Sequence, residues 1–200
     1  MILAAGLSLL LLQAGCGRPA APTAVATLPA ALPTPLQEAL YQSSGGGEPR
    51  TGGYWIMWST CGENSQAEMA KANGGRQAGW VILDDLLADP GMLVGAVAVE
   101  SCPQGVALLQ GRAAGGGDRS NDPAYSLASQ LLAAQLNLAA SAESCPAAEQ
   151  AVQAAQLLLV SLEFDGTGSY LGPPTGGREV ETAKILLEQL GEYNTGMLCR

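Results

Sequence analysis

Five cysteines have the widest choice of chemistry in this chain, because a thiolate can attack an electrophile, bind zinc or close a disulfide. They are Cys16, Cys61, Cys102, Cys145 and Cys199. Zinc ribbons and thioredoxin-type redox sites need two cysteines separated by two residues, and no such pair occurs. The remaining interpretations are disulfides and buried free thiols, which pack as small apolar side chains.

The densest group of aromatic residues is a second candidate for function. Tyr54, Trp55 and Trp58 are three of the nine aromatic residues of the chain and lie within five positions. Aromatic faces stack on sugar rings or hold a peptide, so these residues are the candidate ligand-binding surface. The alternative is that they cover the hydrophobic core beside Cys61.

Carboxylates allow a different function, since glycosidases use two acids roughly 5–10 Å apart across a cleft. Asp84 and Asp85 are adjacent, and on a helix adjacent side chains point about 100° apart, so they do not face each other. The other acids considered are Glu100, Glu143, Glu163 and Asp165, for which solvated surface positions are the simpler interpretation. The chain has no histidine, the commonest general base and metal ligand, and we predict neither a metal nor a cofactor.

The charge balance argues against nucleic-acid binding. Nine Lys and Arg against 18 Asp and Glu give a net charge of −9, which phosphate backbones repel. No local cluster of basic residues offsets this charge.

The first 15 residues have the character of a cleavable signal peptide. Residues 1–12 carry no charge and include six leucines, a stretch too short to span a bilayer about 30 Å thick. Ala14 and Gly15 precede Cys16, and this resembles the lipobox of bacterial lipoproteins. The resemblance implies lipidation at Cys16 and a membrane partner through that anchor; an ordinary signal peptide with an incidental cysteine is the alternative. Lipidation leaves an even set of four cysteines, which predicts two disulfides in an extracellular or cell-envelope protein.

Composition divides the rest of the chain in two. Residues 16–52 are rich in Pro, Ala, Thr and Gly and poor in charge, so they are expected to form the lipid-anchor site and an extended tether. Residues 53–200 contain recurring aliphatic residues and are expected to form one helical extracellular domain.

Three helices are indicated by their start signals and apolar spacing. Asp122 before Pro123 is typical of a helix N-terminus, and apolar residues then recur at steps of three and four over 124–140. A second helix is expected after Ser144, ending before the glycine-rich turn at 165–169, and a third over about 178–192. The inward residues expected on the third helix are Val180, Ala183, Leu187 and Leu190.

The stretch 79–110 predicts shorter elements. Residues 94–100 have the composition of a strand, and Ser101 with Gln104 matches a capping box for a short helix through Leu109. The sequence therefore predicts a mainly α-helical single domain with long Gly/Pro-rich loops and two disulfides, and it leaves room for a minor β element.

Three segments resemble an uncharacterised module of bacterial extracellular proteins. They are Gly53-Tyr54-Trp55, LASQLLAAQLN at 127–137 and EYNTGMLC at 192–199. In that module Gly-Tyr-Trp is followed by Lys-Asn-His-Pro, whereas this chain continues Ile-Met-Trp-Ser. The resemblance implies pairing of Cys145 with Cys199, which leaves Cys61 for Cys102, and it implies no activity.

These observations favour a non-enzymatic surface module that binds a glycan or protein ligand or serves a structural role. A carboxylate-dependent hydrolase of envelope polysaccharide is the alternative, and a structural spacer without a ligand is a third interpretation.

Overall fold

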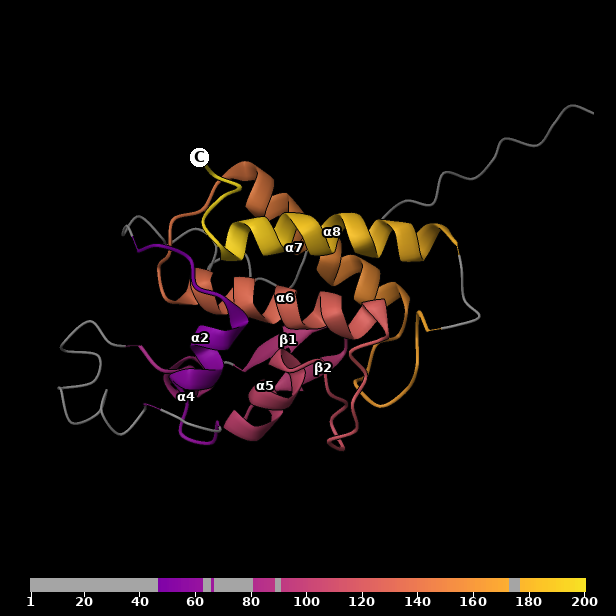
Figure 1. Cartoon of the computed structure of the whole chain (residues 1–200), viewed down its shortest axis with the longest axis horizontal. Helices are drawn as coiled ribbons and strands as arrows, with labels where there is room; N and C mark the ends of the chain where they lie inside the picture. The colour runs from indigo at the N-terminus through magenta and orange to yellow at the C-terminus, as the bar shows by residue number, and fades with distance from the viewer. Residues whose placement is uncertain (1–46, 63–65, 67–80, 89–90, 173–176) are drawn as a thin grey trace, which may run out of the picture. The chain divides into compact units, whose positions relative to one another are not determined.

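The computed structural model describes residues 47–62, 66, 81–88, 91–172 and 177–200. They all lie within the unit Leu32–Arg200. In chain order the elements are α2 (Gly52–Met57), α4 (Leu83–Leu87), β1 (Met92–Val94), β2 (Val97–Val99), α5 (Cys102–Leu109), α6 (Pro123–Ala139), α7 (Pro146–Ser161) and α8 (Arg178–Asn194). The prediction of a mainly α-helical domain with a minor β element is confirmed (Figure 1).

Helix α6 is the centre of the packing and contacts α2, α4, α5, β1, α7 and α8 (Figure 1). It begins as predicted, because the Asp122 side chain accepts a hydrogen bond from the backbone N–H of Ala124 and Pro123 occupies the first turn. The apolar spacing over 124–140 is that of a helix with one polar outer face, but α6 has no such face. Neighbouring elements cover α6 on nearly every side, and even Asn137 is fully buried.

Helices α7 and α8 pack against each other and against α6. Both were predicted, and α8 continues two residues beyond the expected end. Ala183 and Leu190 are buried as expected, but Leu186 enters the core and Leu187 is only half-buried. The buried positions of α8 thus recur at steps of three and four, as a helix with one buried face requires.

Helices α5 to α8 share the same C-terminal geometry. Each is followed by a residue in the left-handed conformation: Gly111 (φ 67°), Ser141 (φ 63°), Glu163 (φ 54°) and Gly196 (φ 72°). The next N–H then donates back into the last turn of the helix: Arg112 to Ala107, Ala142 to Asn137, Phe164 to Leu159 and Met197 to Glu192. This Schellman arrangement gives partners to carbonyls that the helix itself leaves free.

The strand expected over 94–100 is a hairpin instead. Its antiparallel register pairs Met92 with Val99, Leu93 with Ala98 and Val94 with Val97. The chain reverses at Gly95, which has a φ of 60° and lies so close to Phe164 that a Cβ there would be 2.9 Å from the Phe164 carbonyl oxygen. The Gln156 amide of α7 fixes this turn by accepting from the Gly95 N–H and donating to the Gly95 carbonyl, both at 3.0 Å.

Helix α5 starts where predicted, but only part of the capping box forms. The Gln104 side chain accepts hydrogen bonds from the Glu100 N–H (3.2 Å) and the Ser101 hydroxyl (3.0 Å). The Ser101 side chain makes no capping bond to the helix N–H groups, and its hydroxyl donates to Gln104.

The described end of the predicted tether is bonded to the helical domain. Gly47 forms a parallel bridge with Ala142; its N–H donates to Ser141 at 3.5 Å and its carbonyl accepts from Glu143 at 2.9 Å. Ordered contacts therefore begin at least six residues before Gly53, the expected domain start. The predicted signal peptide, Cys16 and the tether up to residue 46 lie outside the described residues. Within the described ranges, no helix combines the length and apolar character needed to cross a bilayer.

Candidate functional site

The three aromatic residues singled out in the sequence lie on or next to α2 and differ in exposure. Trp55 is 1% and Trp58 7% exposed, whereas Tyr54 is half-buried. The Tyr54 ring meets the Trp55 ring edge-on at 5.1 Å, and the Arg50 guanidinium lies 5.1 Å from the Tyr54 centroid. The two indoles leave little surface for a ligand and fit the core interpretation, so the ligand-binding prediction stays a prediction, with Tyr54 as its accessible member.

Asn137 connects Trp55 to α8 through a buried hydrogen-bond network. Its Oδ1 accepts from Trp55 Nε1–H at 3.2 Å and from the Arg50 N–H at 2.8 Å. Its Nδ2 donates to the Arg50 carbonyl at 2.8 Å and to Asn194 Oδ1 at 2.9 Å. Asn194 Nδ2 in turn donates to the main-chain and side-chain oxygens of Gln130, at 3.0 and 2.8 Å. All four hydrogen-bonding positions of the Asn137 amide are therefore occupied.

This network joins the three segments that carry the resemblance. Trp55 belongs to the first segment, Gln130 and Asn137 to the second, and Asn194 to the third. Trp55 and Asn137 are 82 positions apart in the sequence, yet their side chains are hydrogen-bonded. Together with Asn194 they meet between α2, α6 and α8. The distinctive residues of these segments thus hold three helices together.

The disulfides are Cys61–Cys102 and Cys145–Cys199, which confirms the pairing implied by the resemblance. Each bridge fixes the start of a helix, because Cys102 is the first residue of α5 and Cys145 is the N-cap of α7. Such bridges persist in oxidising compartments and indicate an extracellular environment.

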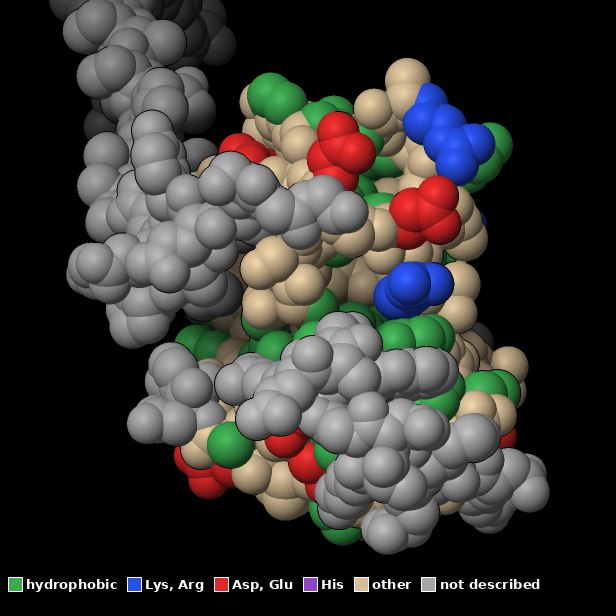
Figure 2. Space-filling model, turned by 90° about the vertical axis from the view of Figure 1, so that its left-hand side faces the viewer, with side chains coloured by type: hydrophobic (Ala, Val, Ile, Leu, Met, Phe, Trp, Pro, Cys, Tyr) green, Lys and Arg blue, Asp and Glu red, His purple; other side chains and the backbone are tan. Residues whose placement is uncertain are grey.

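A pocket of about 190 Å³ lies where the incoming segment passes the end of α8. It is lined by Gly47, Glu48, Pro49, Glu143, Tyr193, Thr195, Gly196, Cys199 and Arg200. The volume is below the roughly 300–1,000 Å³ of sites for drug-sized ligands, so the pocket suits a ligand of few atoms. Figure 2 views the side on which α8 ends in Figure 1 and shows acidic and basic side chains close together there.

Two acidic residues on neighbouring segments line this pocket. Since Gly47 is bridged to Ala142, the next residues, Glu48 and Glu143, are neighbours on paired segments, which lie roughly 5 Å apart. Both side chains are exposed. Arg200 adds a cation, and its Nη2 lies 4.0 Å from the place that a Cβ at Gly196 would occupy.

Tyr193 supplies a buried part of the pocket wall. The residue has 0% exposure, and its hydroxyl has no hydrogen-bond partner among the described residues. Burial and, secondarily, the charge of Glu149 raise the pKa of Tyr193 to about 12. The hydroxyl is therefore a protonated, unused donor at neutral pH.

Two aspartates considered from the sequence, Asp84 and Asp165, support loops. Asp84 accepts hydrogen bonds from the N–H (2.9 Å) and the hydroxyl of Thr60. Asp165 accepts from the Tyr170 and Thr167 side chains and the Thr167 N–H, and these bonds lower the pKa of Asp165 to about 2. The 165–169 segment is the predicted glycine-rich turn. No three His, Cys, Asp or Glu side chains in the described part of the chain group as a metal site would require.

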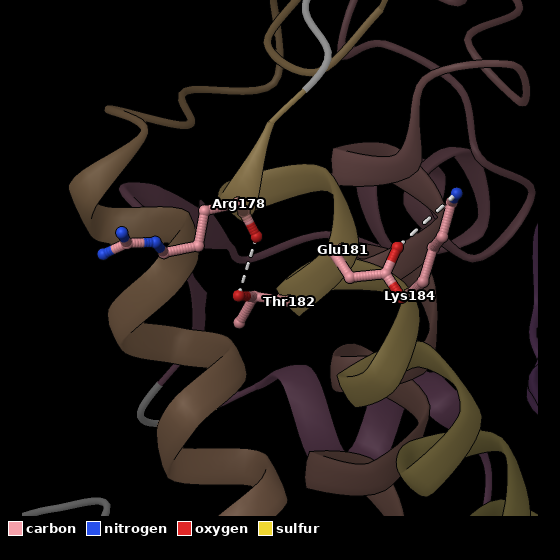
Figure 3. Close-up of polar contacts among 4 residues, drawn as sticks. All are labelled: Arg178, Glu181, Thr182 and Lys184. Atoms are coloured by element: carbon pink, nitrogen blue, oxygen red, sulfur yellow. Dashed lines mark hydrogen bonds and ion pairs between the residues drawn. The ribbon is translucent and has the colours of Figure 1, made fainter.

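The exposed face of α8 carries ordinary surface charges. Figure 3 shows the Lys184–Glu181 ion pair at 3.9 Å, with side chains 63% and 70% exposed, and the Thr182 hydroxyl donating to the Arg178 carbonyl at 2.8 Å. Exposed pairs of this kind contribute about 0–1 kcal/mol. Of the acids considered from the sequence, Glu100, Glu143, Glu163 and Asp165 are all exposed.

Neither the amide network nor the pocket was predicted from the sequence. For Asn137 a signal was present, because it stands in the apolar run LLAAQLNLAA, where a polar side chain has to be buried with partners. For Glu48 there was none, since its position beside Glu143 depends on a pairing between segments 95 residues apart.

Comparison with known proteins adds no relative from which a role could be transferred. No family model, no curated protein and no solved structure matches the chain. The resemblance to the extracellular module stays a prediction.

Proposed function

We propose that this chain is an exported module, held at the cell envelope by a lipid on Cys16, with a non-enzymatic binding or structural role. The proposal includes membership of the extracellular module that the three segments resemble. The observation that carries it is the pair of disulfides.

The disulfides stabilise the domain, and such bonds persist in the oxidising environment outside the cell. Their cysteines are 41 and 54 residues apart, and closing loops of that length stabilises a fold by about 4 kcal/mol each in the chain-entropy treatment. An apolar leader followed by Ala14, Gly15 and Cys16 supplies the matching route of export.

A binding or structural role is favoured over catalysis because well-ordered carboxylates accept hydrogen bonds that position the chain. Asp122 illustrates it: one carboxylate oxygen accepts from Ala124 and Leu171 N–H groups, and the other accepts from the Tyr170 N–H and the Ser169 hydroxyl. This side chain joins the start of α6 to the loop after α7, which is a positioning task. A small pocket with both charge signs offers a place for binding.

The test is the intact mass of the full chain recovered from membranes of an expressing bacterium, alkylated under denaturing conditions without reduction. We expect a mass that begins at Cys16, carries acyl chains and shows no alkylated thiol. The Cys16→Ser variant is the matched control and should lose both the acyl mass and the membrane association while keeping both disulfides.

Each departure has a clear meaning. A membrane-free protein cleaved elsewhere would refute the lipid anchor. Alkylation at several of the four remaining cysteines would refute the oxidised, extracellular domain and return thiol chemistry to consideration.

A further inference from the structure

The pocket beside the end of α8 combines two carboxylates, a guanidinium and an unused hydroxyl donor, and we infer that it binds a small zwitterion such as a free amino acid. The ligand's ammonium lies between Glu48 and Glu143. Its carboxylate lies toward Arg200 and Tyr193. This inference rests on the proposed binding role and specifies the site and the class of ligand.

The acidic wall favours an ammonium group. Like charges on paired neighbouring segments destabilise each other, and a cation between them removes that cost. Among the described residues neither Glu48 nor Glu143 forms an ion pair within 4.0 Å, although Arg200 lines the same pocket. An ammonium donates three hydrogen bonds from one compact charge, which suits two adjacent carboxylates. The net charge of −9 also attracts cations to the surface.

The opposite wall favours a carboxylate. A guanidinium presents parallel N–H groups that match a carboxylate, and Arg200 supplies one. Tyr193 adds a hydroxyl whose hydrogen bond is unmade, in a fully buried residue where an unmade bond is costly. Glu149, the acid that acts on this hydroxyl, already accepts a hydrogen bond from Ser144 at 2.9 Å.

The walls are held in place before a ligand arrives. The Cys145–Cys199 bridge fixes the tail beside α7, and the Gly47 bonds fix the incoming segment. A small ligand gains affinity from such preorganisation because little ordering remains to be done on binding.

The experiment titrates three matched probes into the full chain with both disulfides oxidised, following backbone amide shifts by NMR. Alanine carries both charges, alaninamide carries only the ammonium, and N-acetylalanine carries only the carboxylate. We expect alanine to bind most tightly and to shift the Gly47 and Gly196 amides.

Variants test which residues bind the ammonium group and which bind the carboxylate of the ligand. The double variant Glu48→Gln, Glu143→Gln should weaken alanine and alaninamide about tenfold, the effect of losing a charge-assisted bond, and leave N-acetylalanine unchanged. Arg200→Gln should weaken alanine but not alaninamide. Tyr193→Phe keeps the ring and should weaken alanine; unchanged affinity would overturn the role of this hydroxyl. Glu181→Gln on the exposed face of α8 is the control and should change nothing.

Absence of saturable binding by alanine, equal binding of all three probes, or equal loss in Glu181→Gln would overturn the inference. The proposed lipid anchor and export are tested separately, by the intact-mass measurement. A lipidated, disulfide-bonded chain that ignores alanine refutes only the ligand, and a chain that binds alanine without a lipid refutes only the anchor.

Discussion

Replacing Asn137 by Ala should destabilise the domain more than any other polar substitution on α6. The change removes four hydrogen bonds, to the Arg50 N–H, the Arg50 carbonyl, Trp55 Nε1 and Asn194 Oδ1. Each partner left unsatisfied costs at least about 1 kcal/mol, and the better helix propensity of Ala returns only about 0.5 kcal/mol. The expected loss is about 3–4 kcal/mol, against a total stability of about 5–15 kcal/mol for a domain.

The assay is urea unfolding of the full chain, followed by tryptophan fluorescence, with the disulfides intact in every variant. Gln153 on α7 is exposed and gives the matched control, because Gln153→Ala changes helix propensity without removing a buried partner. The urea midpoint of Gln153→Ala should differ from that of the parent only by the small shift of an ordinary surface substitution. A loss below about 1 kcal/mol in Asn137→Ala would refute the idea that this network holds the helices together.

Asn137→Asp sharpens the same prediction. The shape is kept, but an acceptor now faces the Arg50 carbonyl and Asn194 Oδ1, and ionisation would leave a buried charge without a basic partner. The folded-state pKa of the new carboxyl should therefore rise above the unfolded value of about 3.9. Stability relative to the parent should fall as the pH rises above about 4, and a pH-independent difference would contradict this reasoning.

Three further outcomes are expected. Ser141→Gly and Glu163→Gly should each stabilise the domain by about 0.5–1 kcal/mol in urea unfolding, because both residues have positive φ values in helix caps; a loss in both would contradict the cap geometry. Asp165 has a folded pKa of about 2, below its ordinary 3.8, so its contribution is present above pH 4 and lost as the pH falls toward 2; Asp165→Asn should flatten the thermal stability profile there. Replacing Cys145 and Cys199 together by Ser should cost about 4 kcal/mol in urea unfolding, and an unchanged midpoint would show that the loop closure contributes nothing.

The long helices were predictable because their signals are local. Asp122 and Pro123 mark the start of α6 through the backbone geometry of one turn, and Pro146 does the same for α7. The side that each helix buries was harder to predict. On α8, Leu186 and Leu187 are equally apolar, and only the position of α6 and α7 decides that Leu186 lies deeper.

The short elements depended on contacts that a linear pattern does not contain. The hairpin at Gly95 is held by Gln156, 61 residues further along the chain. The incoming segment is held by Ser141 and Glu143, and composition alone does not predict these bonds before Gly53. In both places a backbone group is hydrogen-bonded to a residue far away in the sequence. Such partners can be identified only once the packing of the helices is known.

The amide network and the pocket involve neighbouring residues of the same two segments, the incoming segment and the end of α8. Asn137 holds the main chain of Arg50, next to Pro49 in the pocket wall, and Asn194 holds the end of α8, next to Tyr193. Residues of the segments that resemble the extracellular module thus serve both parts: Asn137 and Asn194 belong to the buried network, and Tyr193, Gly196 and Cys199 line the pocket. Glu48 and Glu143 lie outside those segments. It follows that Asn137→Ala should weaken alanine binding although it lies outside the pocket. If affinity is kept while stability is lost, the walls are positioned by the Cys145–Cys199 bridge and the Gly47 bonds alone.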